Sequence, residues 1–137
     1  MTLSTSEAED SILAYDPELV SMRLEGRADH AAGQWTSLPQ RPGVLQVRLT
    51  PQAGQQYEAL RGRGSRRLPA ALQAAARAHG SGKHPTRWAV PLGGSRGTFR
   101  LWVGDMRVVY DVLDIDKALL VLAIVDRTEL KDRPRGR

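Results

Sequence analysis

The chain has 137 residues, of which 41% are hydrophobic and 26% charged, and it contains no cysteine. This length suits one domain with a core of moderate size, and the lack of cysteine excludes disulfides, thiolate chemistry and cysteine-based metal sites. The longest apolar run, residues 118–125, is too short to span a bilayer, and the acidic N-terminus does not match a signal peptide. We therefore expect a cytoplasmic protein that does not act on membranes.

The charges are distributed unevenly along the chain. Residues 1–43 carry seven acids and three arginines, a net charge of −4, whereas residues 44–137 carry seventeen bases and eight acids, a net charge of +9. A small region this basic attracts polyanions, with nucleic acid as the usual partner. A surface charged only for solubility would give the same asymmetry, so both interpretations remain open at this point.

Composition divides the chain into three parts. We expect an acidic, partly helical N-terminal extension with a linker at residues 1–43, a folded domain at 44–130 and a basic tail at 131–137. The opposite charges of the first two parts suggest that residues 7–32 fold back on a basic face of the domain. An ordinary helix beside the domain, or disorder, are the alternatives.

Local signals mark the elements of the first half. Asp16 and Pro17 match the N-cap and first position of a helix, and the Pro- and Gly-rich stretch 37–43 is typical of a linker. A strand follows at residues 44–49, and Thr50 caps a helix that begins with a first-turn proline.

The helix after Thr50 is the first of a predicted α-hairpin. Its second helix is predicted over Pro69–His79. Apolar residues at helical spacing give the inward sides of the two helices: Ala53, Tyr57 and Leu60 in the first, and Leu68, Leu72, Ala75 and Ala76 in the second.

Strands dominate the second half. We expect an edge strand at 88–92, strands at 97–103 and 106–113, a turn at 114–117 and a strand at 118–125. The last strand is almost wholly apolar, which is typical of an interior strand covered on most of its area. The order predicts an α+β fold, in which an N-terminal strand and the α-hairpin pack on a small, mainly antiparallel sheet, with an N-terminal helical extension.

The dipeptide Gly104-Asp105 separates two apolar runs and predicts a two-residue hairpin. In that register Trp102 pairs with Arg107, and side chains alternate between the two faces of the sheet. One face then carries Phe99, Leu101, Val103, Met106, Val108 and Tyr110, and the other carries Arg100, Trp102, Arg107, Val109 and Asp111. The first set is a core face for the helices, and the second is expected on the open side of the sheet.

The second face has the chemistry of a nucleic-acid contact. Arginine binds a phosphate through two parallel hydrogen bonds, and an indole can stack on a base. The purely structural alternative is that Trp102 covers the sheet, with Arg107 stacked on it through a cation–π contact.

The runs FRLWVGDMRVVYDVLD and LLVLAIVDR resemble the RelE/ParE toxin superfamily of bacterial type II toxin–antitoxin modules. The resemblance covers about residues 44–130, with the strand at 44–49 and the α-hairpin in the order of the family. It implies a RelE-like fold and a cognate antitoxin as partner. Members of one branch cleave mRNA on the ribosome by attack of a ribose 2′-OH on the adjacent phosphate.

The resemblance also assigns roles by position. Arg107 matches the family's phosphate-stabilising arginine, Arg127 matches its basic residue at the end of the last strand, and Arg100 stands where a lysine is proposed as base. These three are the implied catalytic residues. Further RNA contacts are expected from Trp102, Lys83, His84, Arg87 and Lys131.

Two departures from the family pattern bear on catalysis. Arg100 cannot act as a base because arginine does not lose its proton in proteins, and no aromatic residue follows Tyr110. His84, in a basic loop, could exchange a proton instead. No metal site or cofactor is expected, because no histidine and acid spacing suggests one.

Three functions therefore remain open: an mRNA-cleaving toxin that relies on electrostatic stabilisation, a ParE-like toxin that acts by binding DNA gyrase, and an inert module of the same fold that binds a partner. The composition of the Arg100, Trp102 and Arg107 face favours the first. The missing base keeps the other two open.

Overall fold

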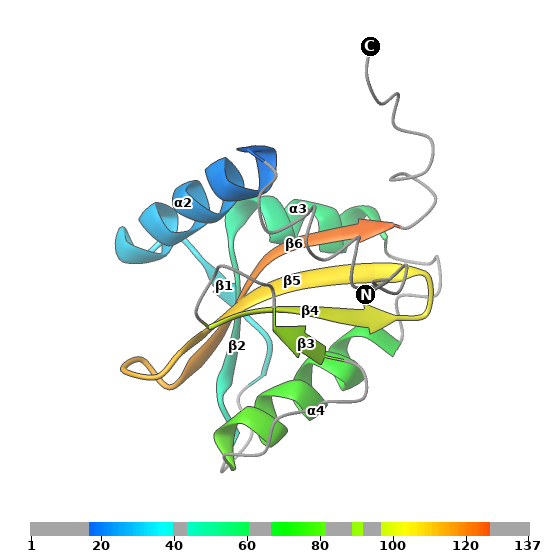
Figure 1. Cartoon of the computed structure of the whole chain (residues 1–137). Coiled ribbons are helices and arrows are strands. Elements are labelled where there is room, and N and C mark those ends of the chain that lie inside the picture. Colours follow the sequence, from blue (N-terminus) through cyan, green and yellow to red (C-terminus); the bar gives the residue numbers. More distant parts are fainter. Residues whose placement is uncertain (1–16, 40–43, 61–66, 82–88, 92–96, 127–137) are drawn as a thin grey trace, which may run out of the picture.

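The computed structural model of the chain describes residues 17–39, 44–60, 67–81, 89–91 and 97–126 (Figure 1). The described residues form three helices and one six-stranded sheet. The helices are α2 (Pro17–Ala31), α3 (Pro51–Ala59) and α4 (Arg67–Gly80). The strands are β1 (Thr36–Ser37), β2 (Gln46–Leu49), β3 (Ala89–Pro91), β4 (Thr98–Val103), β5 (Met106–Leu113) and β6 (Ala118–Asp126).

The strands lie in the order β1-β2-β6-β5-β4-β3. All neighbours are antiparallel except β2 and β6, which run parallel. The long connection between these two strands contains the α-hairpin, as a parallel pair requires. The fold is α+β with a mainly antiparallel sheet, and this confirms the predicted fold class.

Helices α3 and α4 cover one face of the sheet with a single apolar core. Leu68, Leu72, Ala75 and Ala76 of α4 and Ala53 of α3 are all buried in it. The six residues predicted for the core face of the hairpin belong to the same cluster. Helical and strand periodicity therefore predicted both sides of this layer correctly.

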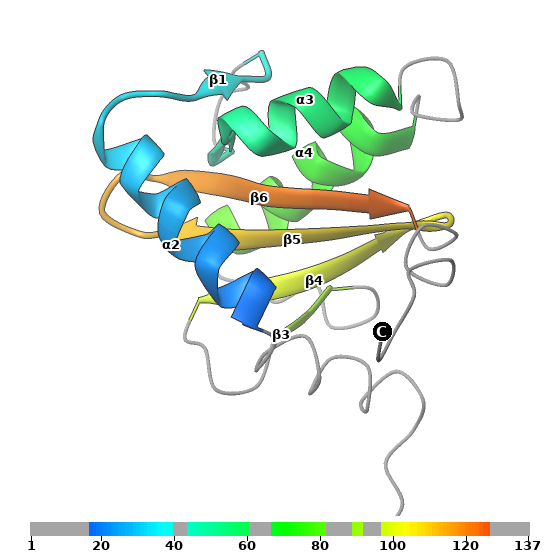
Figure 2. The ribbon, with the colours of Figure 1, turned by 90° about the horizontal axis from the view of Figure 1, so that it is seen from above.

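Helix α2 packs on the opposite face, so the sheet lies between helices on both sides (Figure 2). Met22 of α2 contacts a second apolar cluster formed by Val109, Leu113, Ala118, Leu120 and Leu122 of β5 and β6. β6 is thus buried on both faces, which explains why its sequence is almost wholly apolar. Leu24, at 65% exposure, points outward.

The β4–β5 hairpin has the predicted register. Val103 pairs with Met106, Trp102 with Arg107 and Arg100 with Val109. Gly104 has a φ of +60°, a conformation that glycine adopts without steric cost in a tight hairpin turn. The register places Arg100, Trp102 and Arg107 on the α2 face of the sheet, because their neighbours on the other face fill the α3–α4 core.

The start of α3 also follows the sequence. The Thr50 side chain accepts a hydrogen bond from the backbone N–H of Ala53 at 3.1 Å, and Pro51 occupies the first turn. The chain at the start of the predicted linker 37–43 forms a short strand instead. Thr36 and Ser37 pair with Leu49 and Arg48 and add β1 to the sheet. Two residues carry too little periodicity for a strand prediction.

Gly26 lets α2 pack closely against Leu122 of β6 and Thr50. A Cβ there would lie 2.9 Å from Leu122 Cδ2 and 3.0 Å from Thr50 Cγ2, whereas a Cβ at Gly54 in α3 would lie 3.9 Å from its nearest neighbour. Alanine favours a helix by up to about 1 kcal/mol over glycine, but overpacking costs about 1–3 kcal/mol.

We expect Gly26→Ala to lower the free energy of unfolding by about 1 kcal/mol. Gly54→Ala is the control and should raise it by up to about 1 kcal/mol. Urea unfolding measures both. Equal stabilisation by the two substitutions would show that α2 does not pack against Leu122 and Thr50 as described.

Candidate functional site

The side chains of Arg100, Trp102 and Arg107 lie together and are called here the Arg–Trp face. The guanidinium carbon of Arg107 lies 4.5 Å from the centre of the Trp102 ring, and that of Arg100 lies 5.2 Å away. Both distances are within cation–π range. Two adjacent strands therefore place two permanent positive charges around one indole, as the hairpin register predicted.

The burial of this face differs from the sequence expectation. The face was predicted to lie on the open side of the sheet, but Arg100 is only 3% exposed and Arg107 only 5%, while Trp102 is half-buried. The prediction of an open face is therefore wrong. A phosphate can reach these guanidinium groups only after part of the surrounding chain has moved.

Asp111 anchors α2 on the same face of the sheet. Its carboxylate is 1% exposed and accepts hydrogen bonds from Arg27 Nη1 at 3.0 Å, Arg23 Nε at 3.3 Å and the Thr98 hydroxyl at 2.5 Å. Arg23 and Arg27 keep 34% and 47% of their side chains exposed. In its described part the N-terminal extension therefore binds this face through arginines, and not through the acidic residues that the charge asymmetry suggested.

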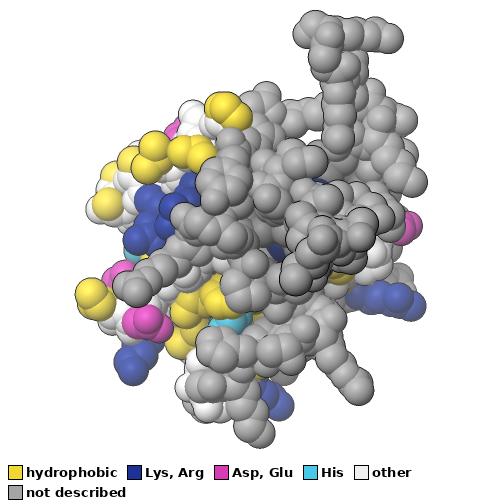
Figure 3. Space-filling view, in the orientation of Figure 1, with side chains coloured by type: hydrophobic (Ala, Val, Ile, Leu, Met, Phe, Trp, Pro, Cys, Tyr) yellow, Lys and Arg dark blue, Asp and Glu magenta, His cyan; other side chains and the backbone are white. Residues whose placement is uncertain are grey.

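A surface view shows how α2 meets solvent (Figure 3). Hydrophobic side chains lie over the outer side of this helix, and Lys or Arg side chains lie beside them. The large apolar residues exposed here are Val20 at 45% and Leu24 at 65%. Helix α2 is therefore amphipathic only in part, and its attachment depends on Met22 and the arginines that reach Asp111.

A second cluster lies where the end of α2 meets β2, and we call it the Trp35 cluster. The guanidinium carbon of Arg48 lies 4.1 Å from the centre of the Trp35 ring. Arg48 donates from Nη1 to His30 Nε2 at 2.7 Å and from Nε to Gln46 Oε1 at 2.8 Å. His30, Trp35 and Arg48 are all half-buried, so each keeps some exposed surface.

No sequence pattern singled out this cluster. His30, Trp35 and Arg48 come from a helix end, a loop and a strand, and no motif links their positions. The only available signal was the alternation of β2, where Gln46 and Arg48 face away from the core residues Val47 and Leu49.

The pKa of His30 is lowered below its usual value of 6.5. Partial burial is the main cause, the positive charges of Arg48 and Arg27 add to it, and the Asp116 carboxylate opposes it. Arg48 can only donate, so His30 Nε2 accepts and the imidazole is neutral in this arrangement. The contact therefore depends on the protonation state of His30.

We expect this histidine to make the fold sensitive to acid. Because the folded chain binds the His30 proton less readily than the unfolded chain, its contribution to stability is complete above pH 6.5 and is lost as the pH falls through the lowered pKa. Urea unfolding above and well below pH 6.5 should show a smaller acid-induced loss in His30→Gln than in the parent chain. An equal loss in both would contradict the assignment.

His79 of α4 contributes to the opposite layer of the protein. Its Nε2 lies 2.8 Å from the hydroxyl of Tyr110, and its ring packs 4.6 Å from Phe99. Burial raises the pKa of the fully buried Tyr110 hydroxyl, which therefore stays protonated. This contact joins α4 to the core that packs on β4 and β5. It lies on the other side of the sheet from the Arg–Trp face.

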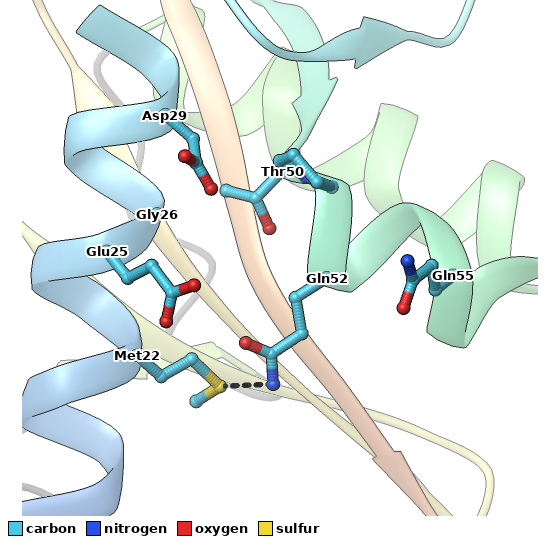
Figure 4. A pocket seen from close by; sticks show the side chains of 8 residues that line it. Met22, Glu25, Gly26, Asp29, Thr50, Gln52 and Gln55 are labelled. Atoms are coloured by element: carbon cyan, nitrogen blue, oxygen red, sulfur yellow. Dashed lines mark hydrogen bonds between the residues drawn. The ribbon is translucent and has the colours of Figure 1, made fainter. Parts of the chain in front are cut away.

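A pocket of about 290 Å³ opens between α2 and α3 (Figure 4). Two carboxylates, Glu25 and Asp29, line it together with the amides of Gln52 and Gln55. Met22 closes one end, where its sulfur lies 3.1 Å from the Gln52 amide nitrogen. Carboxylates repel phosphate, so this pocket is a poor place for a polyanion.

The remaining predicted site residues, Lys83, His84, Arg87, Arg127 and Lys131, lie outside the described residues. Within the described part of the chain, no group of three or more metal-binding side chains comes together. The same residues include no helix with the length and hydropathy that a membrane crossing requires.

The α+β architecture, with the α-hairpin on one face of the sheet, is a RelE-like fold. The chain is similar to a chain of the RelBE2 toxin–antitoxin complex of Mycobacterium tuberculosis, with a TM-score of 0.50 and 24% sequence identity. The match covers 61% of this chain and 99% of the other. This likeness establishes the fold, and no protein-family model or curated protein matches the chain.

Proposed function

We propose that this protein is the toxin of a type II toxin–antitoxin module and cleaves mRNA on the ribosome. The observation that carries the proposal is the Arg–Trp face, in which Arg100 and Arg107 flank Trp102 at cation–π distance on a RelE-like sheet. The likeness to a chain of a toxin–antitoxin complex supports an antitoxin as the partner. A protein with these partners would act in the cytoplasm.

The proposed reaction is an internal transesterification of RNA. The ribose 2′-hydroxyl gives up its proton to water as its oxygen attacks the adjacent phosphorus, the bond from phosphorus to the 5′-oxygen breaks, and the leaving 5′-oxygen takes up a proton from water. The products carry a 2′,3′-cyclic phosphate and a 5′-hydroxyl. Negative charge increases on the phosphoryl oxygens in the transition state, and fixed cations stabilise it there.

In this proposal Arg107 and Arg100 stabilise that negative charge, and Trp102 stacks on a base beside the phosphate. Arg127 is proposed for the leaving-group side, and Lys83, His84, Arg87 and Lys131 for further RNA contacts. Arginine keeps its proton, so neither Arg100 nor Arg107 serves as the base for the 2′-OH.

The described part of the face offers no replacement base. Asp111 is the one carboxylate that the register of the β4–β5 hairpin places on this face. It already accepts hydrogen bonds from Arg23, Arg27 and Thr98. The proposal therefore assigns the rate enhancement to charge stabilisation and to the positioning of the RNA, which can supply several powers of ten.

Induced expression in a bacterial host tests the proposal and its alternatives. We expect growth arrest with cleaved mRNA, only while ribosomes translate. Growth arrest with intact mRNA and inhibited supercoiling would point to a gyrase-directed toxin instead. Normal growth together with stable binding to the product of a neighbouring gene would point to an inert partner-binding module. Each of these two results would overturn the proposal.

A further inference from the structure

We propose that the Trp35 cluster is a second contact site for single-stranded RNA, in which Arg48 binds a phosphate and Trp35 stacks on the neighbouring base. This inference rests on the proposed function for its choice of RNA as the ligand. It concerns different residues, in a different part of the sheet, and it is tested by binding and not by cleavage.

The geometry of Arg48 suits a phosphate. The guanidinium carbon lies over the Trp35 ring, 4.1 Å from its centre, and Gln46 and His30 accept hydrogen bonds from the group. These contacts use two of its five N–H groups and leave three for a ligand. A guanidinium fixed in this way loses less conformational freedom when it binds an anion than a mobile surface arginine does.

Trp35 adds a stacking surface, which an anion without an aromatic ring does not use. Trp35 is half-buried, so part of its surface remains accessible. An indole next to a phosphate-binding arginine suits a ligand that carries a planar base and a phosphate side by side, as a nucleotide does. A protein carboxylate would use the arginine alone, and for this reason the observations favour RNA.

The position of the cluster supports the same conclusion. Arg48 pairs with Leu120, whose side chain belongs to the apolar cluster under α2, so Arg48 projects from the same face of the sheet as the Arg–Trp face. Across the sheet, Arg48 on β2 lies two strand spacings from Arg107 on β5 and three from the β4 residues, or about 10 and 14 Å. Along the strands, Arg48 is level with Asp111, which is four residues, or about 13 Å, from Arg107. Arg100 and Arg107 are buried, whereas Arg48 is only half-buried and keeps some surface accessible in the folded chain.

His30 positions Arg48 in this account. Its neutral Nε2 accepts a hydrogen bond from Nη1 of Arg48, while Gln46 accepts one from Nε. The imidazole is roughly parallel to the Trp35 ring, at 24° and 6.1 Å between centres. Together these two hydrogen bonds hold the guanidinium over the indole.

Fluorescence anisotropy of the full-length protein with labelled oligouridine tests the proposal. We expect Arg48→Gln to weaken binding about tenfold and to reduce the slope of log affinity against log salt by about 0.7, the value for one lost phosphate contact on a single strand. Trp35→Leu should weaken binding about tenfold with little change in that slope. Arg77→Gln, an exposed arginine of α4, is the matched control and should leave both quantities unchanged.

The outcomes separate this inference from the proposed function. Unchanged affinity and salt slope in Arg48→Gln and Trp35→Leu, with thermal unfolding like that of the parent, would overturn the inference even if the protein cleaves mRNA. Weaker binding by both variants, with mRNA left intact on translating ribosomes, would support the inference and refute the proposed function. A parent chain that fails to bind the RNA would also overturn the inference.

Discussion

Replacement of Asp111 by alanine should lower the free energy of unfolding by about 3 kcal/mol. The carboxylate is almost fully buried and accepts three side-chain hydrogen bonds that connect β5, β4 and α2. Its removal leaves the buried Thr98 hydroxyl without this acceptor and two arginines without their shared counter-charge. Because both arginines are partly exposed, water can hydrate them in the variant and offsets part of the lost stability. The expected effect is therefore at the lower end of the range for breaking a buried ion pair.

Urea unfolding with two comparison variants makes this test specific. Asp111→Asn keeps the shape and one acceptor and should lose less stability than the alanine variant. Asp114→Ala removes a carboxylate from an exposed position in the β5–β6 turn and should change stability by less than about 0.5 kcal/mol. Equal stability of Asp111→Ala and Asp114→Ala would show that α2 is not anchored through Asp111.

Arg107→Ala should abolish growth arrest and reduce mRNA cleavage at least about 100-fold. Arg107 is the guanidinium closest to Trp102 and is assigned to the charge that develops on the phosphoryl oxygens. Loss of one such donor typically costs two to three powers of ten in rate, so even a well-expressed variant would fall below the level that stops growth. Growth curves after induction and the mRNA fragments in the same cells measure the effect.

Burial of Arg107 requires a control for folding, because truncation of a buried side chain also affects stability. Arg107→Lys keeps the charge but not the planar pair of donors, so it should retain partial activity. Arg77→Ala removes an exposed arginine on the opposite layer and should arrest growth like the parent chain. Undiminished arrest by a folded Arg107→Ala variant would remove Arg107 from the mechanism.

The parts of the fold that depend on local sequence were predictable. The Gly104–Asp105 turn determined the register of the hairpin, and thereby the face on which every side chain of β4 and β5 lies. Thr50 and Pro51 marked the start of α3. The continuous apolar run of β6 indicated a strand covered on both faces, and α2 and the α-hairpin supply the two covers.

The parts that depend on distant contacts were not predictable. The parallel pairing of β2 with β6 joins Gln46 to Ala118, and no local pattern specifies a partner so far along the chain. The charge asymmetry suggested that acidic residues 7–32 fold back on a basic face, but net charge does not tell which side chains make a contact. The contact is made by Arg23 and Arg27 on Asp111, a carboxylate inside the basic domain.

The candidate site shows the same division. Alternation along two strands was enough to bring Arg100, Trp102 and Arg107 together, whereas the burial of this face depends on the path of the rest of the chain. The Trp35 cluster needs three segments to meet, and the alternation of β2 was the only signal in the sequence for any of its members. Residue types alone indicated affinity for phosphate, and only the fold distinguishes a buried arginine from an accessible one.

In the proposed mechanism, a RelE-like sheet carries an arginine-based centre for cutting mRNA. The most direct measurement incubates the purified full-length protein with end-labelled mRNA, with and without ribosomes programmed on that mRNA. We predict cleavage only with ribosomes, fragments ending in a 2′,3′-cyclic phosphate, no cleavage at a nucleotide whose 2′-OH is replaced by hydrogen, and a large loss of activity in Arg107→Ala. Intact mRNA in the presence of programmed ribosomes would contradict the account.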